Sequence, residues 1–273
     1  MLLGVVLMSV PLSVPLYIWE YAATNGRTVI WAPISVFGVF VLCLPGWMRR
    51  VHHCLQPGQI LGLSGSQAWW RGWSVAFVAG VLGVTLLYGL QLLLGWGAWG
   101  LPDSISRRFL FEGLLVGLGV GLAEELIFRG WLLYELEQDY SITLALWINA
   151  IVFAIAHFLR PLEDILATWP QFIGLVLLGL ALVWARRIPL RKHRGERTVM
   201  TLGPAAGLHG GLVFAYYQVD ANDLIISTYQ VPEWVTGISG NPLAGLLGLG
   251  FLGMIGGVTY GLSHRSAQNT TSR

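Results

Sequence analysis

The chain alternates long apolar stretches with short polar connections, and this alternation predicts its elements. A membrane-spanning helix needs about 20 mostly apolar residues. Tryptophans lie near the ends of most of the apolar stretches, as in the aromatic belts at membrane surfaces. We therefore predict an all-α polytopic membrane protein, a bundle of about eight transmembrane helices. The predicted spans are residues 2–19, 29–47, 74–99, 106–134, 142–159, 170–185, 199–218 and 240–262.

The composition supports the same conclusion. Hydrophobic residues make up 55% of the chain and charged residues only 11%, whereas soluble domains carry about 25% charged residues. The expected partners are therefore membrane lipid and a substrate that reaches the membrane, with no role for nucleic acid.

Basic residues gather in three connections that eight spans would place on one side of the membrane. The positive-inside rule assigns that side, and both termini, to the cytoplasm, with the cell membrane as the default location. Connection 219–239 is acidic and is expected outside, while Arg107 and Arg108 deviate from the rule. The residues behind the assignment are Arg49, Arg50, Arg71, Arg186, Arg187, Arg191, Lys192, Arg194, Arg197, Arg265 and Arg273.

Two glycine stripes predict close helix packing. Gly117 and Gly121 lie four residues apart in the fourth span, and Gly253, Gly257 and Gly261 repeat that spacing in the last span. Small residues at this spacing let the backbones of membrane helices approach each other.

Ionisable residues interrupt the fourth span, in the run Glu124-Glu125-Leu-Ile-Phe-Arg129. Such groups are costly at membrane depth and mark functional sites by default. On a helix, Glu125 and Arg129 stand four residues apart and can pair, whereas Glu124 points about 100° away. We expect one carboxylate to be neutralised and the other to remain available for proton chemistry.

The fifth span places a histidine at the depth of Glu124. The connection at 139–141 predicts a helical hairpin between the two spans, and Glu124 and His157 each lie about sixteen residues from it. Antiparallel packing therefore brings the two side chains to one level. One helical face carries Asn149, Phe153 and His157, because each follows the one before it by four residues.

A second histidine, His209, lies in the seventh span, about a dozen residues beyond the basic connection. One carboxylate and two imidazoles can thus converge inside the bundle. The chain has no G-x-S-x-G or H-E-x-x-H motif, and no serine or cysteine nucleophile is evident in these spans. A carboxylate that activates water, with a histidine to assist, suits amide hydrolysis.

These motifs resemble those of the CPBP family (Abi, or type II CAAX endopeptidases) of intramembrane proteases. The matching elements are Glu124-Glu125-x-x-x-Arg129, then Phe153-x-x-x-His157, then the later His209. The resemblance implies an eight-helix bundle and a glutamate-type endopeptidase, in CAAX-type C-terminal processing or related peptide maturation. It divides the chain into N-terminal helices (1–108), a catalytic core (109–217) and an outer loop, last helix and tail (218–273).

Roles in the family carry over by position. Glu124 would activate the water with help from His157, and His209 would hold the water or the oxyanion. Phe153 would pack beside the site, and Glu125, like Arg129, would shape it.

The third motif departs from the family at Val213. An asparagine or aspartate usually stands there, four residues after the histidine, but valine donates no hydrogen bond. Since Val213 lies one turn beyond His209, its side chain should face the same site. Asn149 is our candidate for a compensating oxyanion donor.

Two alternatives to a cofactor-free protease stay open. Glu124, His157 and His209 could be ligands of a catalytic zinc ion, since a carboxylate with two histidines is a known zinc set. The departure at Val213 instead favours a non-catalytic membrane scaffold or immunity protein. The substrate under the protease hypothesis is a peptide or a membrane protein.

Overall fold

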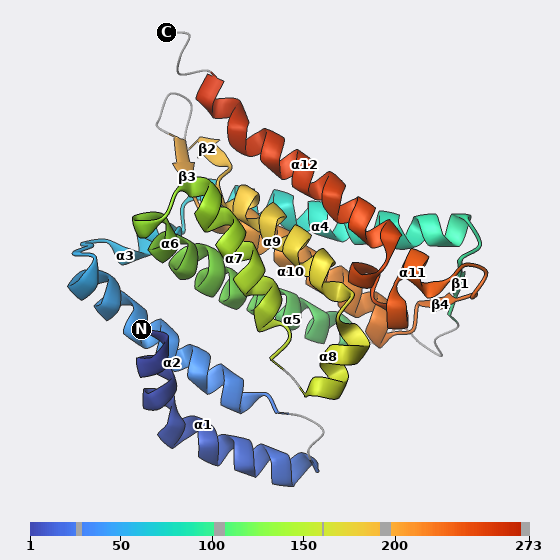
Figure 1. Ribbon diagram of the computed structural model, residues 1–273, viewed down its shortest axis with the longest axis horizontal. Coiled ribbons are helices and arrows are strands. Elements are labelled where there is room, and N and C mark those ends of the chain that lie inside the picture. The colour runs from blue at the N-terminus through green and yellow to red at the C-terminus, as the bar shows by residue number, and fades with distance from the viewer. Residues whose placement is uncertain (26–28, 101–106, 160, 192–197, 269–273) are drawn as a thin grey trace. The chain divides into compact units, whose positions relative to one another are not determined.

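The computed structural model describes residues 1–25, 29–100, 107–159, 161–191 and 198–268 (Figure 1). The chain forms two compact units, Met1–Ile60 and Leu61–Arg273, and each is described by itself. Of the basic residues that predict the orientation, Lys192, Arg194, Arg197 and Arg273 lie outside the described residues.

The first unit consists of two long helices and one short one: α1 (Leu2–Thr24), α2 (Trp31–Val51) and α3 (Pro57–Ile60). Glu20, near the end of α1, is only 5% exposed. Its carboxylate accepts hydrogen bonds from the backbone amides that begin α2, those of Ile30, Trp31 and Ala32, at 2.8, 2.7 and 3.1 Å. The carboxylate thereby satisfies three of the four amides that a helix start leaves without partners.

The second unit is also helical. Its helices are α4 (Gln67–Leu93), α5 (Arg107–Glu125), α6 (Leu133–Asp139), α7 (Ile142–Ala156), α8 (Leu162–Thr168), α9 (Gln171–Arg186), α10 (Gly203–Ala221), α11 (Glu233–Thr236) and α12 (Leu246–Gln268). A π-helix (Leu126–Leu132) joins α5 to α6, and two 3₁₀ turns, Ile238–Gly240 and Pro242–Ala244, precede α12.

Four short strands form two antiparallel pairs in this unit. Strand β1 (Gly97–Trp99) pairs with β4 (Ile225–Ser227), with Ala98 opposite Ile226. Strand β2 (Pro189–Arg191) pairs with β3 (Thr198–Met200), with Leu190 opposite Val199. These pairs join helix ends and leave the fold all-α, as predicted.

Helices occupy all eight predicted spans, but fewer of them are long and apolar enough to cross a membrane. Among the described residues four qualify: α1, α2, α4 and the stretch Leu246–His264 of α12. A fifth is added if α8 and α9, which meet at an angle of 79°, form one broken span. The number of eight transmembrane helices is therefore not confirmed, whereas the membrane class of the protein is.

Helix α10 packs closely against both α4 and α5 (Figure 1). A Cβ atom at Gly117 or Gly121 of α5 would lie 2.7 Å from backbone atoms of Gly210. On the other side, a Cβ at Gly80 of α4 would lie 2.7 Å from the Leu208 carbonyl oxygen. The stripe predicted in the fourth span is therefore a true close-packed seam.

The stripe predicted in the last span is wrong. A Cβ atom at Gly253, Gly257 or Gly261 would have no atom within 4 Å among the described residues. The glycines of α12 that do meet a neighbour are Gly248, against the Pro242 carbonyl, and Gly256, where a Cβ would lie 3.4 Å from the Trp184 ring. Spacing alone did not reveal which face of α12 is covered.

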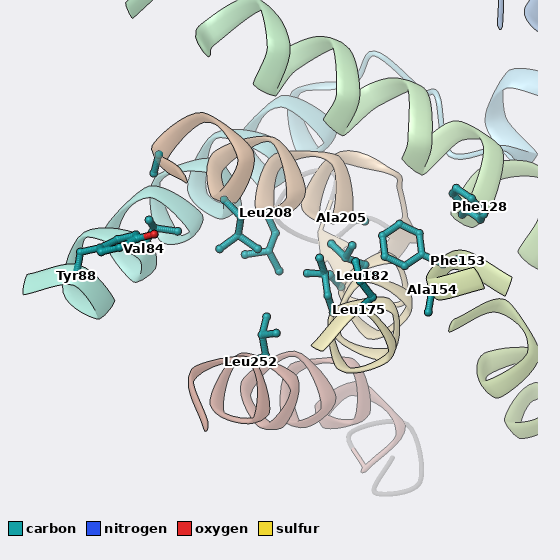
Figure 2. Packing of buried hydrophobic residues seen from close by; sticks show 14 residues of the cluster. Val84, Tyr88, Phe128, Phe153, Ala154, Leu175, Leu182, Ala205, Leu208 and Leu252 are labelled. Carbon is teal, nitrogen blue, oxygen red and sulfur yellow. The ribbon is translucent and has the colours of Figure 1, made fainter. Parts of the chain in front are cut away.

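The core of the unit is formed by apolar side chains from α4, α7, α9, α10 and α12 (Figure 2). In a membrane such packing stabilises mainly through van der Waals contact, because lipid tails are as apolar as leucine. The side chains labelled in the figure are Val84, Tyr88, Phe128, Phe153, Ala154, Leu175, Leu182, Ala205, Leu208 and Leu252.

The predicted hairpin is present. Helix α6 ends at Asp139, and Ser141 caps α7 by accepting a hydrogen bond from the Leu144 amide at 3.3 Å. Serine is a preferred residue at this position because its hydroxyl satisfies an amide that the helix leaves without a partner. The hairpin sets the register of α7 against α5 and so places the site.

Candidate active site

Three of the predicted side chains, Glu124, His157 and His209, line one cavity of about 230 Å³. They come from the last turn of α5, the end of α7 and the middle of α10. Glu124 is 30% exposed in its side chain and is turned toward this space. Apolar residues form most of the remaining wall: Val84, Leu87, Val120, Leu175, Leu178, Leu212, Val213, Pro242, Leu243, Phe251 and Leu252.

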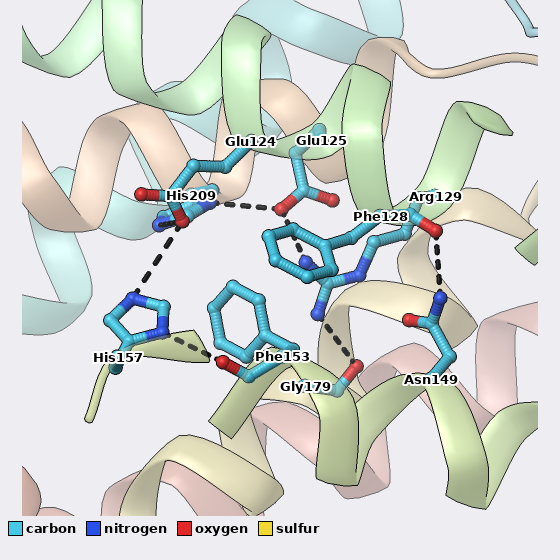
Figure 3. A network of polar contacts seen from close by, with 9 residues as sticks. All are labelled: Glu124, Glu125, Phe128, Arg129, Asn149, Phe153, His157, Gly179 and His209. Atoms are coloured by element: carbon cyan, nitrogen blue, oxygen red, sulfur yellow. Dashed lines mark hydrogen bonds and ion pairs between the residues drawn. The ribbon is translucent and has the colours of Figure 1, made fainter. Parts of the chain in front are cut away.

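Both imidazoles approach the same oxygen of Glu124 (Figure 3). Glu124 Oε2 lies 3.7 Å from His157 Nε2 and 4.0 Å from His209 Nε2. This confirms the prediction that the carboxylate and the two histidines meet at one depth. Both distances are longer than a direct hydrogen bond. A small molecule such as water can bridge polar groups that are separated in this way.

The other ring nitrogen of each histidine is already engaged. His157 Nδ1 lies 2.8 Å from the Phe153 carbonyl oxygen, and because a carbonyl only accepts, this nitrogen carries the proton. His209 Nδ1 lies 2.9 Å from Glu125 Oε1. The remaining ring nitrogen of each histidine, Nε2, is the one that approaches Glu124.

Glu125 and Arg129 form a buried pair behind the cavity, as the sequence predicted. Their side chains have no exposed surface, and Arg129 NH1 donates to Glu125 Oε1 at 2.8 Å. Arg129 NH2 also donates to the Gly179 carbonyl oxygen of α9 at 3.1 Å. Such a pair is tolerated in a low-dielectric interior when hydrogen bonds supplement the charge attraction.

Phe153 lies between this pair and the histidines. The Arg129 guanidinium sits 4.2 Å from the centre of its ring, a cation–π distance. The same ring is 4.6 Å from the ring of His157 and 6.0 Å from that of His209, measured between centroids. Phe153 has no exposed surface, and it therefore packs against both imidazoles as predicted.

A π-helix begins directly after Glu125, and Asn149 fastens it. Asn149 Nδ2 donates to the Phe128 carbonyl oxygen within the π-helix at 2.7 Å. The side chain is fully buried and does not line the cavity. Asn149 therefore shapes the site from behind, and its assignment as an oxyanion donor is wrong. Short π-helical segments often occur at functional sites.

The comparison with known families agrees with the geometry. Residues 106–215 match the family model described as type II CAAX prenyl endopeptidase Rce1-like. This segment is Rce1-like. The family resemblance of the motifs is thereby confirmed, and it supports a CAAX-type intramembrane protease at the level of the family. No curated protein and no solved structure matches the chain significantly.

The Rce1-like segment extends from the start of α5 to Ala215, so it holds Glu124, His157, His209 and Val213. Val213 lines the cavity, as its place one turn after His209 predicted. The apolar side chain leaves this wall without the donor that the motif usually supplies.

No group of three or more histidine, cysteine, aspartate or glutamate side chains is arranged to hold a metal ion among the residues that the structure describes. As chemical groups, a carboxylate and two imidazole nitrogens without protons suit zinc. Zinc binding stays a prediction.

Two contributors to the site lie outside the sequence motifs. One is the Gly179 carbonyl, which accepts from Arg129 and has no side-chain signal in the sequence. The other is Asn241, which lines the cavity from a turn outside the Rce1-like segment. The sequence predicts a helix from residue 240, but a 3₁₀ turn spans Pro242–Ala244 and α12 begins at Leu246, since the Asn241-Pro242 dipeptide is a turn signal.

Proposed function

We propose that the protein is an intramembrane endopeptidase in which Glu124 activates the attacking water. The observation that carries the proposal is the convergence of one carboxylate oxygen and two imidazole nitrogens on the cavity wall. All three atoms are hydrogen-bond acceptors when the imidazoles are neutral. A water between them can donate one proton to Glu124 and the other to a histidine, which leaves its lone pair directed at the substrate.

In the proposed reaction, ionised Glu124 takes a proton from the water as the oxygen bonds to the carbonyl carbon of the peptide. The carbonyl becomes an oxyanion, and the tetrahedral intermediate then expels the amine. Glu124 returns its proton to the leaving nitrogen, so the carboxylate is regenerated. General base catalysis of this kind contributes typically about 10²–10⁴-fold in rate.

Glu125 and Arg129 serve as positioning residues in this mechanism. The Glu125 carboxylate accepts from His209 Nδ1 and so fixes both the tautomer and the ring orientation. Arg129 donates to the same Glu125 oxygen at 2.8 Å and so holds the carboxylate in place. His157 is oriented in the same way by the Phe153 carbonyl.

The apolar wall of the cavity favours a substrate with apolar side chains or a lipid group. The type II CAAX prenyl endopeptidase family suggests a prenylated C-terminal peptide. The test is cleavage of a synthetic prenylated CAAX peptide by purified protein in lipid vesicles, with products identified by mass spectrometry. We expect the wild type to release the terminal tripeptide and Glu124→Gln to release none. Equal product from both proteins would remove the proposal.

The zinc alternative is favoured by the same three acceptor atoms. It predicts stoichiometric metal in the purified protein and loss of cleavage with a chelator, restored by added zinc. Under the water mechanism, cleavage persists in chelator and the metal content is substoichiometric. The scaffold alternative predicts no product from either wild type or Glu124→Gln, although both remain folded.

We further propose that all eight helical regions cross the cell membrane and that both termini are cytoplasmic. Single cysteines at Arg71 and Gln268, in a chain without Cys43 and Cys54, test this with an impermeant thiol reagent. Both sites should be protected in intact cells and labelled after permeabilisation. Labelling of only one site in intact cells would mean an odd number of spans between them.

A further inference from the structure

A short turn, Asn241 to Leu243, lines the cavity that also holds Glu124. The turn contacts both α9 and α12, and α9 in turn contacts α7, whose end carries His157. Different elements thus bring Asn241 and Glu124 to the wall of one cavity.

Two glycines hold this turn against its neighbours. A Cβ at Gly174 of α9 would collide with the Leu243 carbonyl, and one at Gly248 of α12 would collide with the Pro242 carbonyl. Backbone therefore packs directly on backbone at both contacts.

Helix α9 links the turn to the end of α7. The rings of Phe172 on α9 and of Phe158, which directly follows His157, are 6.0 Å apart between centroids. Gly174, two residues after Phe172, meets the Leu243 carbonyl of the turn. The turn and the end of α7 therefore both adjoin the first part of α9.

The side chain of Asn241 is oriented by its own turn. Its Oδ1 accepts a hydrogen bond from the Leu243 amide at 2.9 Å. Because a backbone amide can only donate, the acceptor must be Oδ1, which directs Nδ2 to the other side. Nδ2 has no hydrogen-bond partner among the described residues, and the half-buried side chain lines the cavity.

The other polar side chains of the cavity wall differ from Asn241. Glu124 and the two Nε2 atoms are acceptors in the proposed reaction, and Tyr216 carries an O–H group. Within the described lining, Asn241 Nδ2 is the one side-chain N–H group without a partner. It is therefore the side-chain N–H group of this wall that remains available to the carbonyl oxygen of a bound peptide.

We propose that Asn241 donates a hydrogen bond to the carbonyl oxygen of the scissile peptide and so replaces the donor missing at Val213. The inference rests on the proposed function. As the water oxygen bonds to the carbonyl carbon and Glu124 takes the proton, the carbonyl oxygen gains negative charge and the hydrogen bond from Asn241 strengthens. Removal of one such donor typically lowers kcat by about 10²–10³-fold.

Asn241→Asp is the decisive variant. Aspartate keeps an oxygen to cap the turn, but it has no N–H group, and when ionised it donates no hydrogen bond. We expect kcat on the prenylated CAAX peptide to fall about 100-fold, with KM and the unfolding temperature close to those of the wild type. A merely structural residue would change KM or the unfolding temperature and leave kcat of the folded fraction intact.

Rescue provides a second readout. In Asn241→Asp, the further change Val213→Asn places an amide at the usual motif position, and we expect it to recover at least about tenfold in kcat, a part of one donor's contribution. The matched control is Val213→Leu, which has nearly the size of asparagine but no donor, and it should recover nothing.

The outcomes separate the two proposals. If Glu124→Gln abolishes cleavage while Asn241→Asp keeps the wild-type kcat, the protease function stands and the role of Asn241 is overturned. Equal recovery by Val213→Asn and Val213→Leu would also overturn it. If Glu124→Gln still cleaves, the proposed function itself fails.

Discussion

Two neighbouring carboxylates, Glu124 and Glu125, point in different directions from the same helix end and have different surroundings. Glu125 has no exposed surface, and one of its oxygens accepts from both Arg129 and His209. Glu124 is 30% exposed in its side chain, and its Oε2 accepts no hydrogen bond among the described residues. The buried side is bound to its partners, whereas the cavity side is left free for chemistry.

The comparison teaches that a membrane protein can place two like charges in adjacent positions when they serve separate purposes. Arg129 lies 2.8 Å from the carboxylate of Glu125 and offsets its negative charge. Substitutions on the cavity side should therefore change rate, and those on the buried side should change stability. The predictions below test this division, from the largest expected effect to the smallest.

Glu124→Gln should abolish cleavage and leave the unfolding temperature unchanged. The amide keeps the shape of the side chain but cannot take a proton from water, and loss of a general base typically costs about 10²–10⁴-fold in rate. Product formation by mass spectrometry and thermal unfolding in detergent give the two readings. A large loss of stability with a small loss of rate would reverse the assignment of the two sides.

Arg129→Met should destabilise the protein by about 3–5 kcal/mol, because it leaves the Glu125 carboxylate buried without its charged partner. Glu125→Gln should be destabilising for the converse reason and should also lower activity, since His209 loses its acceptor. Denaturant unfolding in mixed micelles measures the change.

The matched control for this pair is the double variant Glu125→Leu/Arg129→Met, which removes both charges. It should be more stable than either single variant, because apolar residues often replace a buried ion pair at little cost. If the double variant lost as much unfolding free energy as the two single variants together, burial of an unpaired charge would not be the cause of their instability.

Asn149→Ala should cost about 1 kcal/mol or slightly more, the typical net worth of one buried hydrogen bond. The effect is small because the Phe128 carbonyl keeps a second donor, the backbone amide of Leu133. Activity should fall only as far as the folded fraction falls. A selective loss of kcat in folded Asn149→Ala would instead show that Asn149 contributes to catalysis.

Helix positions and the meeting of the site residues could be predicted from the sequence. Apolar length located the helices, and the hairpin at 139–141 gave the common depth of Glu124 and His157. The pairing of Glu125 with Arg129 followed from helical spacing alone. These features depend on local periodicity and on one short connection, which a single sequence records well.

Features that depend on contacts between distant segments could not be predicted. The hydrogen bond of Asn149 to the π-helix requires the rotation of α7 about its axis, which the four-residue spacing leaves open. Asn241 is far from the motifs in sequence, and it reaches the cavity because its turn packs against α9 and α12. The uncovered glycines of α12 show the same limit, since spacing identifies a stripe but not its neighbour.

The close-packed seams around α10 have a consequence for how such sequences evolve. Added side chains at Gly207, Gly210 or Gly211 would collide with the backbone of α4 or α5, so any descendant that still folds must keep these positions small. Selection for folding alone would then preserve the glycine-rich surroundings of His209 after catalysis had been lost. The mark of a working enzyme is therefore the side chains that face the cavity and bear no packing duty, Glu124 first among them.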